Sequence, residues 1–275
     1  MELRLLELSS LLYFLSALAF CAHVLWSAKR LERGGPLLLG LGFGVHGMAI
    51  ALRTFSVGVL PVTGFAEGMS FFAWLMVGAY AVAQQRYRLA VIGAVVSPLA
   101  FVLTLGASLM YVSGHSISAE FKSPWLPIHV TLAFLGNAVF ALAFAVSVIY
   151  LLQESLLKSH RRAWMLQKLP ALEQLDRLNY VCLFWGFPLL SLGILTGGIW
   201  AANTWGRFWS GEPREILSIV LWLMYAGLLQ FRLSAGLSGR RAALLTILGF
   251  GVLVVSYLAV NILPLSGRHG GGAAL

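Results

Sequence analysis

Residues 199–215 read IWAANTWGRFWSGEPRE and separate two apolar runs, each long enough to cross a lipid bilayer. The segment combines large aromatic rings, arginines and glutamates, as expected of a loop at a membrane surface: Trp200, Trp205, Phe208, Trp209, Arg207, Arg214, Glu212 and Glu215. An interfacial aromatic belt would account for the rings, because indoles favour the headgroup layer in any membrane protein. Rings and guanidinium groups crowded into one loop also suit a flat amphiphile with carboxylates, such as haem. Both interpretations remain open at this point.

The composition of the whole chain is that of a polytopic membrane protein. Hydrophobic residues make up 59% of the 275 residues, charged residues 11%, and the mean hydropathy is +0.85. The net charge of +9 does not indicate nucleic-acid binding, because the basic residues lie in short loops rather than on one face. The two cysteines, Cys21 and Cys182, lie inside apolar runs and are interpreted as small buried hydrophobic residues.

Eight apolar runs predict an all-α fold with eight transmembrane helices. Their lengths near twenty residues and the lack of a period-two pattern favour helices over a barrel. The first run has no small-residue cleavage site after it and is interpreted as an uncleaved span. Small-x-x-x-small spacings at Gly40/Gly44 and Gly193/Gly197 predict close helix packing. The predicted spans lie near residues 9–27, 36–56, 67–84, 89–109, 128–152, 178–201, 215–233 and 242–263.

The basic residues predict the orientation. Most of the 19 lysines and arginines follow the first, third, fifth and seventh spans: Lys29, Arg30, Arg33, Arg86, Arg88, Lys158, Arg161, Arg162, Lys168, Arg177, Arg232, Arg240 and Arg241. By the positive-inside rule these connections are cytoplasmic, so both termini and the segment 199–215 face outward. The longest cytoplasmic connection ends in leucines at three- to four-residue spacing over 169–180, which predicts a short amphipathic helix at the inner surface.

The histidines are the most informative polar residues. His129 opens the fifth span and His269 follows the eighth, so both are predicted at the depth of the tryptophan-rich segment. Two imidazoles at one depth beside aromatic rings could bind a haem iron from both axial sides. A single interfacial histidine is more often a solvated polar tip. His115 is a third outer histidine with no evident role.

Other polar residues lie within the predicted spans. His46 is in the middle of the second span and His23 is in the inner half of the first, with Gln230 of the seventh at a similar depth. A second ligand site or interhelical hydrogen bonds would explain them, and hydrogen bonds are slightly favoured. Glu67 is predicted to pair with Arg53. No Ser-His-Asp set or Walker loop is present in the sequence, which gives hydrolase and nucleotide-driven functions no support.

With these residues identified, the chain resembles the cytochrome c assembly family, the CcsA/CcmC-type haem-handling membrane proteins with a tryptophan-rich outer loop called the WWD domain. The resemblance extends from Leu169 to His269, and more loosely back to about His46. Its motifs are LPALEQLDRLNY (169–180), GFPLLSLGILTGGIWA (186–201), WGRFWSGEPRE (205–215), SGRRAA (238–243) and VNILPLSGRH (260–269). We therefore expect one integral-membrane domain over 1–275, with a family core at about 46–269 and a WWD-like loop at 200–215.

The resemblance implies a function and a site. The family's external haem-ligating histidines fall on His129 and His269, so haem b is expected as cargo or bound ligand. The expected role is haem presentation at the outer face of the bacterial inner membrane, to apocytochrome c and beside a CcsB-type (ResB-like) partner. The chain would then be the haem-handling subunit of a holocytochrome c synthase rather than a stand-alone enzyme. The other expected haem contacts are Trp200, Trp205, Arg207, Phe208, Trp209 and Arg214.

Two positions depart from the family pattern. The family's WSWDPKE is WSGEPRE at 209–215, so one ring is absent at Gly211, and the histidine of synthases near the inner end of the seventh span is Gln230. His23 is the candidate that could replace it. An alternative with the same fold is a HemX-like regulator of glutamyl-tRNA reductase in haem synthesis. A weaker alternative is a small-molecule transporter, for which no clear inverted repeat is found.

Overall fold

The computed structural model describes residues 1–26, 33–87, 90–111, 122–159 and 169–262. Within these ranges it contains eight helices that are long and apolar enough to cross a membrane, which confirms the predicted class of an all-α integral membrane protein. A one-turn 3-10 helix, Ala90–Ile92, precedes the fourth of them. The eight are α1 (Glu2–Trp26), α2 (Gly34–Val57), α3 (Phe65–Tyr87), α4 (Gly93–Leu109), α5 (Trp125–Ser159), α7 (Leu172–Trp205), α8 (Pro213–Ser234) and α9 (Gly239–Ile262).

Two helices are longer than their apolar runs. α5 has 35 residues and α7 has 34, so both extend beyond the hydrophobic stretch that predicted them. The separate amphipathic helix predicted over 169–180 is wrong, because Leu172–Tyr180 forms the first turns of α7. Leu175 and Leu178 are fully buried in the main hydrophobic core rather than lying on a membrane surface. The leucine spacing was therefore a packing face of a long helix.

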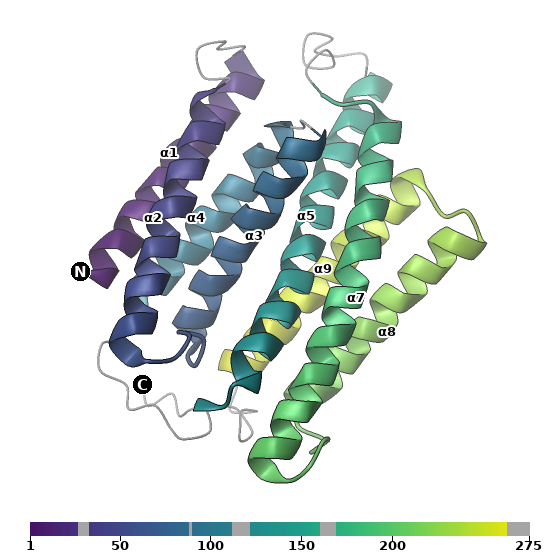
Figure 1. Ribbon diagram of the computed structural model, residues 1–275. Coiled ribbons are helices and arrows are strands. Elements are labelled where there is room, and N and C mark those ends of the chain that lie inside the picture. The colour runs from purple at the N-terminus through teal and green to yellow at the C-terminus, as the bar shows by residue number, and fades with distance from the viewer. Residues whose placement is uncertain (27–32, 88–89, 112–121, 160–168, 263–275) are drawn as a thin grey trace.

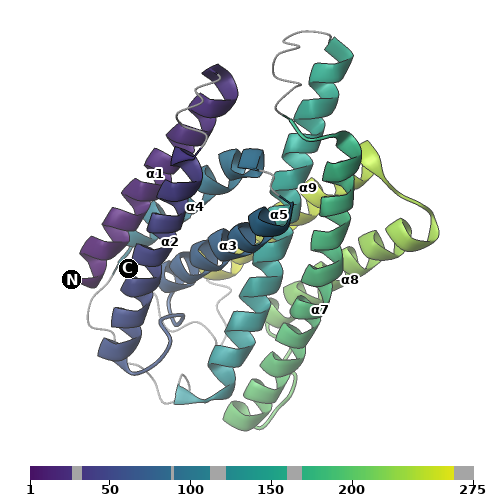
Figure 2. The same cartoon turned by 45° about the horizontal axis from the view of Figure 1, so that its top comes forward.

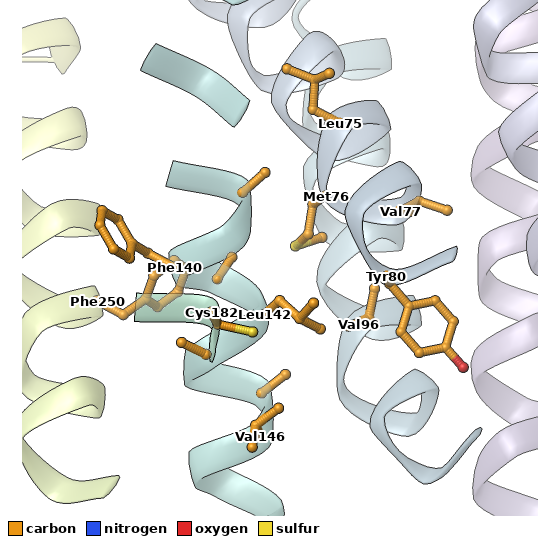
Figure 3. Packing of buried hydrophobic residues seen from close by; sticks show 14 of the residues in the cluster. Leu75, Met76, Val77, Tyr80, Val96, Phe140, Leu142, Val146, Cys182 and Phe250 are labelled. Atoms are coloured by element: carbon orange, nitrogen blue, oxygen red, sulfur yellow. The ribbon is translucent and has the colours of Figure 1, made fainter. Parts of the chain in front are cut away.

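The helices form two groups that meet along one seam. α1, α2, α3 and α4 pack together as a first half, and α5, α7, α8 and α9 form a second half, as Figures 1 and 2 show. α3 joins the halves by packing against α5. Met76 of α3 and Leu142 of α5 lie in the shared hydrophobic core at this seam (Figure 3). The seam leaves room for cavities on either side of these contacts.

Glycines bring α5 and α7 into direct backbone contact. A Cβ on Gly193 would lie 2.8 Å from the Cα of Ala133, and one on Gly136 would lie 2.8 Å from the backbone nitrogen of Leu190. This confirms the packing role predicted for Gly193 and Gly197. The same prediction for Gly40 and Gly44 is wrong, since no described atom lies within 4 Å of a Cβ built at either position. Gly42 makes the close approach in α2 instead, against the ring of Tyr13.

The helix ends form two opposite faces. Glu2 accepts hydrogen bonds from Ser56 (2.6 Å) and Tyr111 (2.7 Å), and the Tyr257 hydroxyl donates to the carbonyl of Phe65 (3.5 Å). The start of α1 and the end of α9 therefore lie at the same end of the bundle as the segment that connects α7 to α8 (Figure 1). We call this the loop end. This arrangement agrees with an even number of spans.

The first half is fastened at the loop end by a cluster around Arg53. Its guanidinium lies 3.5 Å from Glu2 and 3.3 Å from Glu67, and it donates to the Tyr111 hydroxyl at 3.2 Å. The predicted Glu67–Arg53 pair is thereby confirmed. Glu67 also accepts from the backbone N–H groups of Thr63 and Gly64, at the start of α3. Burial and the hydrogen bond to Glu2 raise the pKa of Tyr111. We call this group the Arg53 cluster.

The second half is fastened at the opposite end by a cluster around Arg232. The guanidinium of Arg232 donates to Asp176 at 2.9 Å and to the amide oxygen of Asn179 at 3.0 Å. The other Asp176 oxygen accepts from the backbone of Gly239 at 2.9 Å. The Asn179 amide nitrogen donates to Ser147 and to Thr246, so the Arg232 cluster ties α5, α7, α8 and α9 together. Only 4% of the Arg232 side chain is exposed.

His46 is a hydrogen-bonding residue inside the first half. Its Nδ1 lies 3.2 Å from the Tyr13 hydroxyl and its Nε2 lies 2.8 Å from the Ser70 hydroxyl. The imidazole is fully buried and links α1, α2 and α3. Among the described residues, no group of three or more His, Cys, Asp or Glu side chains could hold a metal ion. Of the two explanations for His46, interhelical hydrogen bonding is therefore the one that the geometry supports.

Candidate functional site

Two adjoining cavities open at the loop end, between the helices of the second half and the connection from α2 to α3, which contributes Val62 and Thr63 to both. Each has a volume of about 260 Å³, and both are lined by His129, Asn137, Arg214 and Ser218. One lies against α7 and the connection from α7 to α8, and the other lies against α9. Ligand pockets in proteins usually occupy about 300–1,000 Å³, so the two cavities together are in the range of a cofactor site.

His129 stands in the wall that the two cavities share. Its Nδ1 lies 2.7 Å from the carbonyl oxygen of Gly193 on α7. A carbonyl can only accept, so Nδ1 carries the proton and the lone pair of the neutral ring is on Nε2. Gly197 leaves space for this ring, because a Cβ there would lie 2.6 Å from Cε1 and 2.7 Å from Nδ1 of the imidazole. A histidine held through Nδ1 in this way is oriented as metal-ligating histidines usually are.

The four aromatic residues of the predicted platform occupy different positions. Trp200 is buried, with 3% of its surface exposed, and its ring is nearly parallel to that of His129, at a centroid distance of 6.2 Å. Phe208 and Trp209 are exposed and line the cavity beside α7, with the Phe208 ring folded against Gly198. Trp205 packs edge-on against Trp200 and is not a lining residue of either cavity. Three of the four rings therefore line the cavity beside α7, and Trp205 packs against one of them, Trp200.

The two arginines of the segment also differ. Arg214 lines both cavities and donates a 3.0 Å hydrogen bond to the amide oxygen of Asn261 on α9. Arg207 is exposed and lines neither cavity. Arg214 is thus a positively charged side chain of defined orientation in the wall of the site, whereas Arg207 lies on the surface.

The connection between α7 and α8 has a defined shape. Gly206 ends α7 in the left-handed region, with φ at 72°, and Glu212 and Glu215 form a capping box at the start of α8. One oxygen of Glu215 accepts from the backbone N–H groups of Ser210, Gly211 and Glu212, at 2.7 to 3.2 Å. The turn between Trp209 and Arg214 is therefore held mainly by the Glu215 carboxylate.

Sequence reasoning missed the polar residues deeper in the site. Asn137 lines both cavities, and its buried Oδ1 has no hydrogen-bond partner among the described residues. Asn137 follows His129 and Ala133 at four-residue steps, so helical periodicity could have placed it on the same face. Asn261 and Tyr257 of α9 line the second cavity. Their signal was weak, because single polar residues near the end of an apolar run are common.

Some predicted ligand positions lie elsewhere or are not described. His269 and His115 fall outside the residues that the structure describes. Gln230 is exposed on α8, while His23 is on α1 at the far side of the bundle. The suggestion that His23 replaces a histidine at position 230 in the same site is therefore not supported by the arrangement of these helices.

Comparison with known proteins agrees with this architecture. The model of the cytochrome C assembly protein family matches residues 62–266. The cytochrome c biogenesis protein CcsA of Thermosynechococcus vestitus is 31% identical, over 81% of this chain and 82% of its own length. The CcsA proteins of Gloeothece citriformis and Porphyra purpurea are 29% and 28% identical; the matches cover 86% and 99% of this chain, and 89% and 99% of those proteins. This chain therefore belongs to the cytochrome c assembly protein family, as a CcsA-type member.

Proposed function

We propose that this protein binds haem as cargo in the cavities at the loop end and presents it for attachment to c-type cytochromes. The observation that carries the proposal is the position of His129, whose Nδ1 is held by the Gly193 carbonyl and whose ring lines both cavities. The residues present fit haem, since imidazole nitrogen, flat rings and a guanidinium match its iron, macrocycle and propionates. Haem b is the form expected before covalent attachment.

Each residue of the site would have a distinct task. His129 would supply one axial ligand, and Trp200 would hold the imidazole plane from behind through the parallel contact at 6.2 Å. Phe208 and Trp209 would cover a face of the macrocycle at the mouth. Arg214, already oriented by Asn261, would pair with a propionate. Trp205 would brace Trp200, and Arg207 would contribute positive charge at the entrance.

His269 would supply the second axial ligand. α9 ends at Ile262, beside the cavity that Tyr257 and Asn261 line. The seven residues from there to position 269 can span about 23 Å when extended, which is enough chain to reach His129. Ligation would then depend on two segments that are distant in sequence and meet only at the loop end.

The proposed setting is the bacterial inner membrane with the loop end outside. The alternation of basic connections supports this orientation, which also places both termini outside. An apocytochrome c would be the acceptor, and a ResB-like membrane protein the partner. The protein would position and ligate the cargo, whereas the thioether bonds form between haem vinyl groups and the acceptor's cysteines. The relatives are named CcsA, which does not favour the regulator of glutamyl-tRNA reductase.

The test is the visible spectrum of the purified protein and of three variants. Wild type is expected to copurify with haem, and both His129→Ala and His269→Ala are expected to lose most of it. Ser218→Ala lines the same cavities without an axial role and serves as the control. Cells carrying the histidine variants should also lack covalently attached c-type cytochromes.

Two results would overturn the proposal. One is a wild-type protein that neither copurifies with haem nor takes it up on titration. The other is normal c-type cytochrome content in cells without the protein together with altered glutamyl-tRNA reductase abundance, which would assign the regulatory role instead.

A further inference from the structure

A third cavity lies in the seam between the two halves, away from the haem site. Its volume is about 700 Å³, the largest of the cavities described here. Its walls come from α3 on one side and from α5 and α7 on the other, with Phe43 of α2 at its edge. The helices that form these walls are long and apolar enough to span a membrane. An opening between such helices would face the lipid tails, so a ligand would enter it from the bilayer.

The walls of this seam cavity are smooth and apolar. Small residues of α3, among them Gly78 and Ala79, form one side, and Leu142 and Cys182 lie on the other. The Trp74 ring stacks on Phe43 with centroids 5.0 Å apart and an interplanar angle of 1°, and its N–H donates to the Phe43 carbonyl. The aromatic wall therefore offers no unsatisfied polar group to a ligand. Such a surface suits acyl chains.

The polar groups of the cavity are confined to one end. Gln85, Arg86 and Tyr87 are consecutive at the end of α3 opposite the loop end, at the level where lipid headgroups lie. No acidic residue is among the lining residues described, and Arg86 forms no ion pair with any described residue. Arg86 is exposed. A base at the rim of an apolar cavity between transmembrane helices is the pattern of an anionic headgroup site.

We propose that the seam cavity binds an anionic phospholipid, with its acyl chains between α3 and α5/α7 and its phosphate paired with Arg86. The distribution of charge favours a lipid over a partner helix, because a helix would leave Arg86 without a complementary group unless it carried an acid at that level. The proposal is independent of haem binding. A lipid in this position would fill the seam and hold the two halves at a fixed separation.

The test is native mass spectrometry of the full-length protein in mild detergent, titrated with dioleoylphosphatidylglycerol or dioleoylphosphatidylcholine. Wild type is expected to retain phosphatidylglycerol about fivefold more than phosphatidylcholine, the preference that one basic residue provides. Arg86→Gln should abolish this preference. Arg33→Gln is the matched control, because Arg33 is an exposed arginine at the same end of the bundle but outside the cavity. Ala79→Trp should reduce retention of both lipids by filling the cavity.

A second measurement locates the lipid. Trp185 lines the cavity and is 61% exposed, so brominated phosphatidylglycerol in phosphatidylcholine vesicles should quench its fluorescence. The quenched component should disappear in Trp185→Phe and weaken in Arg86→Gln. Equal retention of the two lipids by wild type, or an unchanged preference in Arg86→Gln, overturns the proposal. The proposal is also overturned if Ala79→Trp loses a bound haem or a copurifying peptide while its lipid adducts stay unchanged, because the cavity would then hold that other ligand.

Discussion

The two halves of the bundle are fastened by the same kind of interaction at opposite ends. In the first half, Arg53 joins α1, α2 and α3 at the loop end, beside a cavity of about 40 Å³. In the second half, Arg232 joins α7, α8 and α9 at the other end, and the loop end holds two cavities of about 260 Å³ each. In each half, a buried ion pair thus holds the helices together at one end. The candidate site lies at the loop end of the second half, where the described residues form no such pair.

The largest expected effect is on the Arg232 cluster. Arg232→Ala leaves Asp176 and the Asn179 amide oxygen without their main partner, and removing one member of a buried pair destabilises by about 3–5 kcal/mol. The apparent stability is measured by denaturant titration in detergent micelles. Arg240→Ala is the control, because its side chain is 61% exposed and lies 3.8 Å from Glu154, so it should change stability by less than about 1 kcal/mol. Equal effects of the two variants would show that the Arg232 cluster does not hold the second half together.

Arg53→Ala should have a smaller effect, of about 2–3 kcal/mol. Its side chain is 12% exposed, compared with 4% for Arg232, and Glu67 keeps the hydrogen bonds from the backbone of Thr63 and Gly64. The same titration measures this variant. Haem retention should fall little, since Arg53 lines neither cavity and Thr63, which lines both, keeps its hydrogen bonds to Glu67. Loss of haem without loss of stability would mean that the two halves are coupled more tightly than their contacts indicate.

Gly197→Ala directly tests the site around His129 at the loop end of the second half. The added methyl group must displace the His129 imidazole, and overpacking of this kind costs about 1–3 kcal/mol. Under the proposed function, haem affinity should fall about tenfold, measured by haem titration of the purified protein. Gly227→Ala is the matched control, because no described atom lies within 4 Å of a Cβ there. It should instead stabilise α8 by about 0.5–1 kcal/mol. An unchanged haem affinity in Gly197→Ala would show that the position of His129 does not matter for haem binding.

The smallest expected effect is that of Glu215→Ala, at about 1 kcal/mol. This change removes the carboxylate that accepts from the backbone N–H groups of Ser210, Gly211 and Glu212. Because the interaction is exposed, global stability should fall little, while proteolysis between α7 and α8 should accelerate. Limited proteolysis followed by mass spectrometry measures this. A rate equal to that of wild type would show that other contacts hold the connection.

Hydropathy was sufficient to predict the number and type of helices, because burial in a bilayer demands long apolar runs. It could not predict where α5 and α7 end. The first turns of α7 contain charged residues, and one of them, Asp176, is placed against the bundle by Arg232, which is 56 residues away. The glycine motifs show the same limit, since Gly193 packs against a helix and Gly40 does not, although their local sequences are similar in kind.

The candidate site was predicted in part. His129 and Arg214 were identified from residue type and depth, and both line the cavities. The pattern of rings did not reveal that Trp200 is buried while Trp209 is exposed, because a cluster of aromatic residues in a turn does not specify which ring folds inward. Asn137 was missed because an amide within an apolar run has no ligand signature of its own.

The carbonyl of Gly193 also has a kinetic consequence. It accepts from His129 at 2.7 Å and from the Thr196 hydroxyl at 3.0 Å, so its own direction is fixed from two sides. The imidazole therefore needs no torsional search before an incoming ligand arrives. If haem binds here as proposed, its association rate would be limited by diffusion to the site rather than by rotation of the His129 side chain.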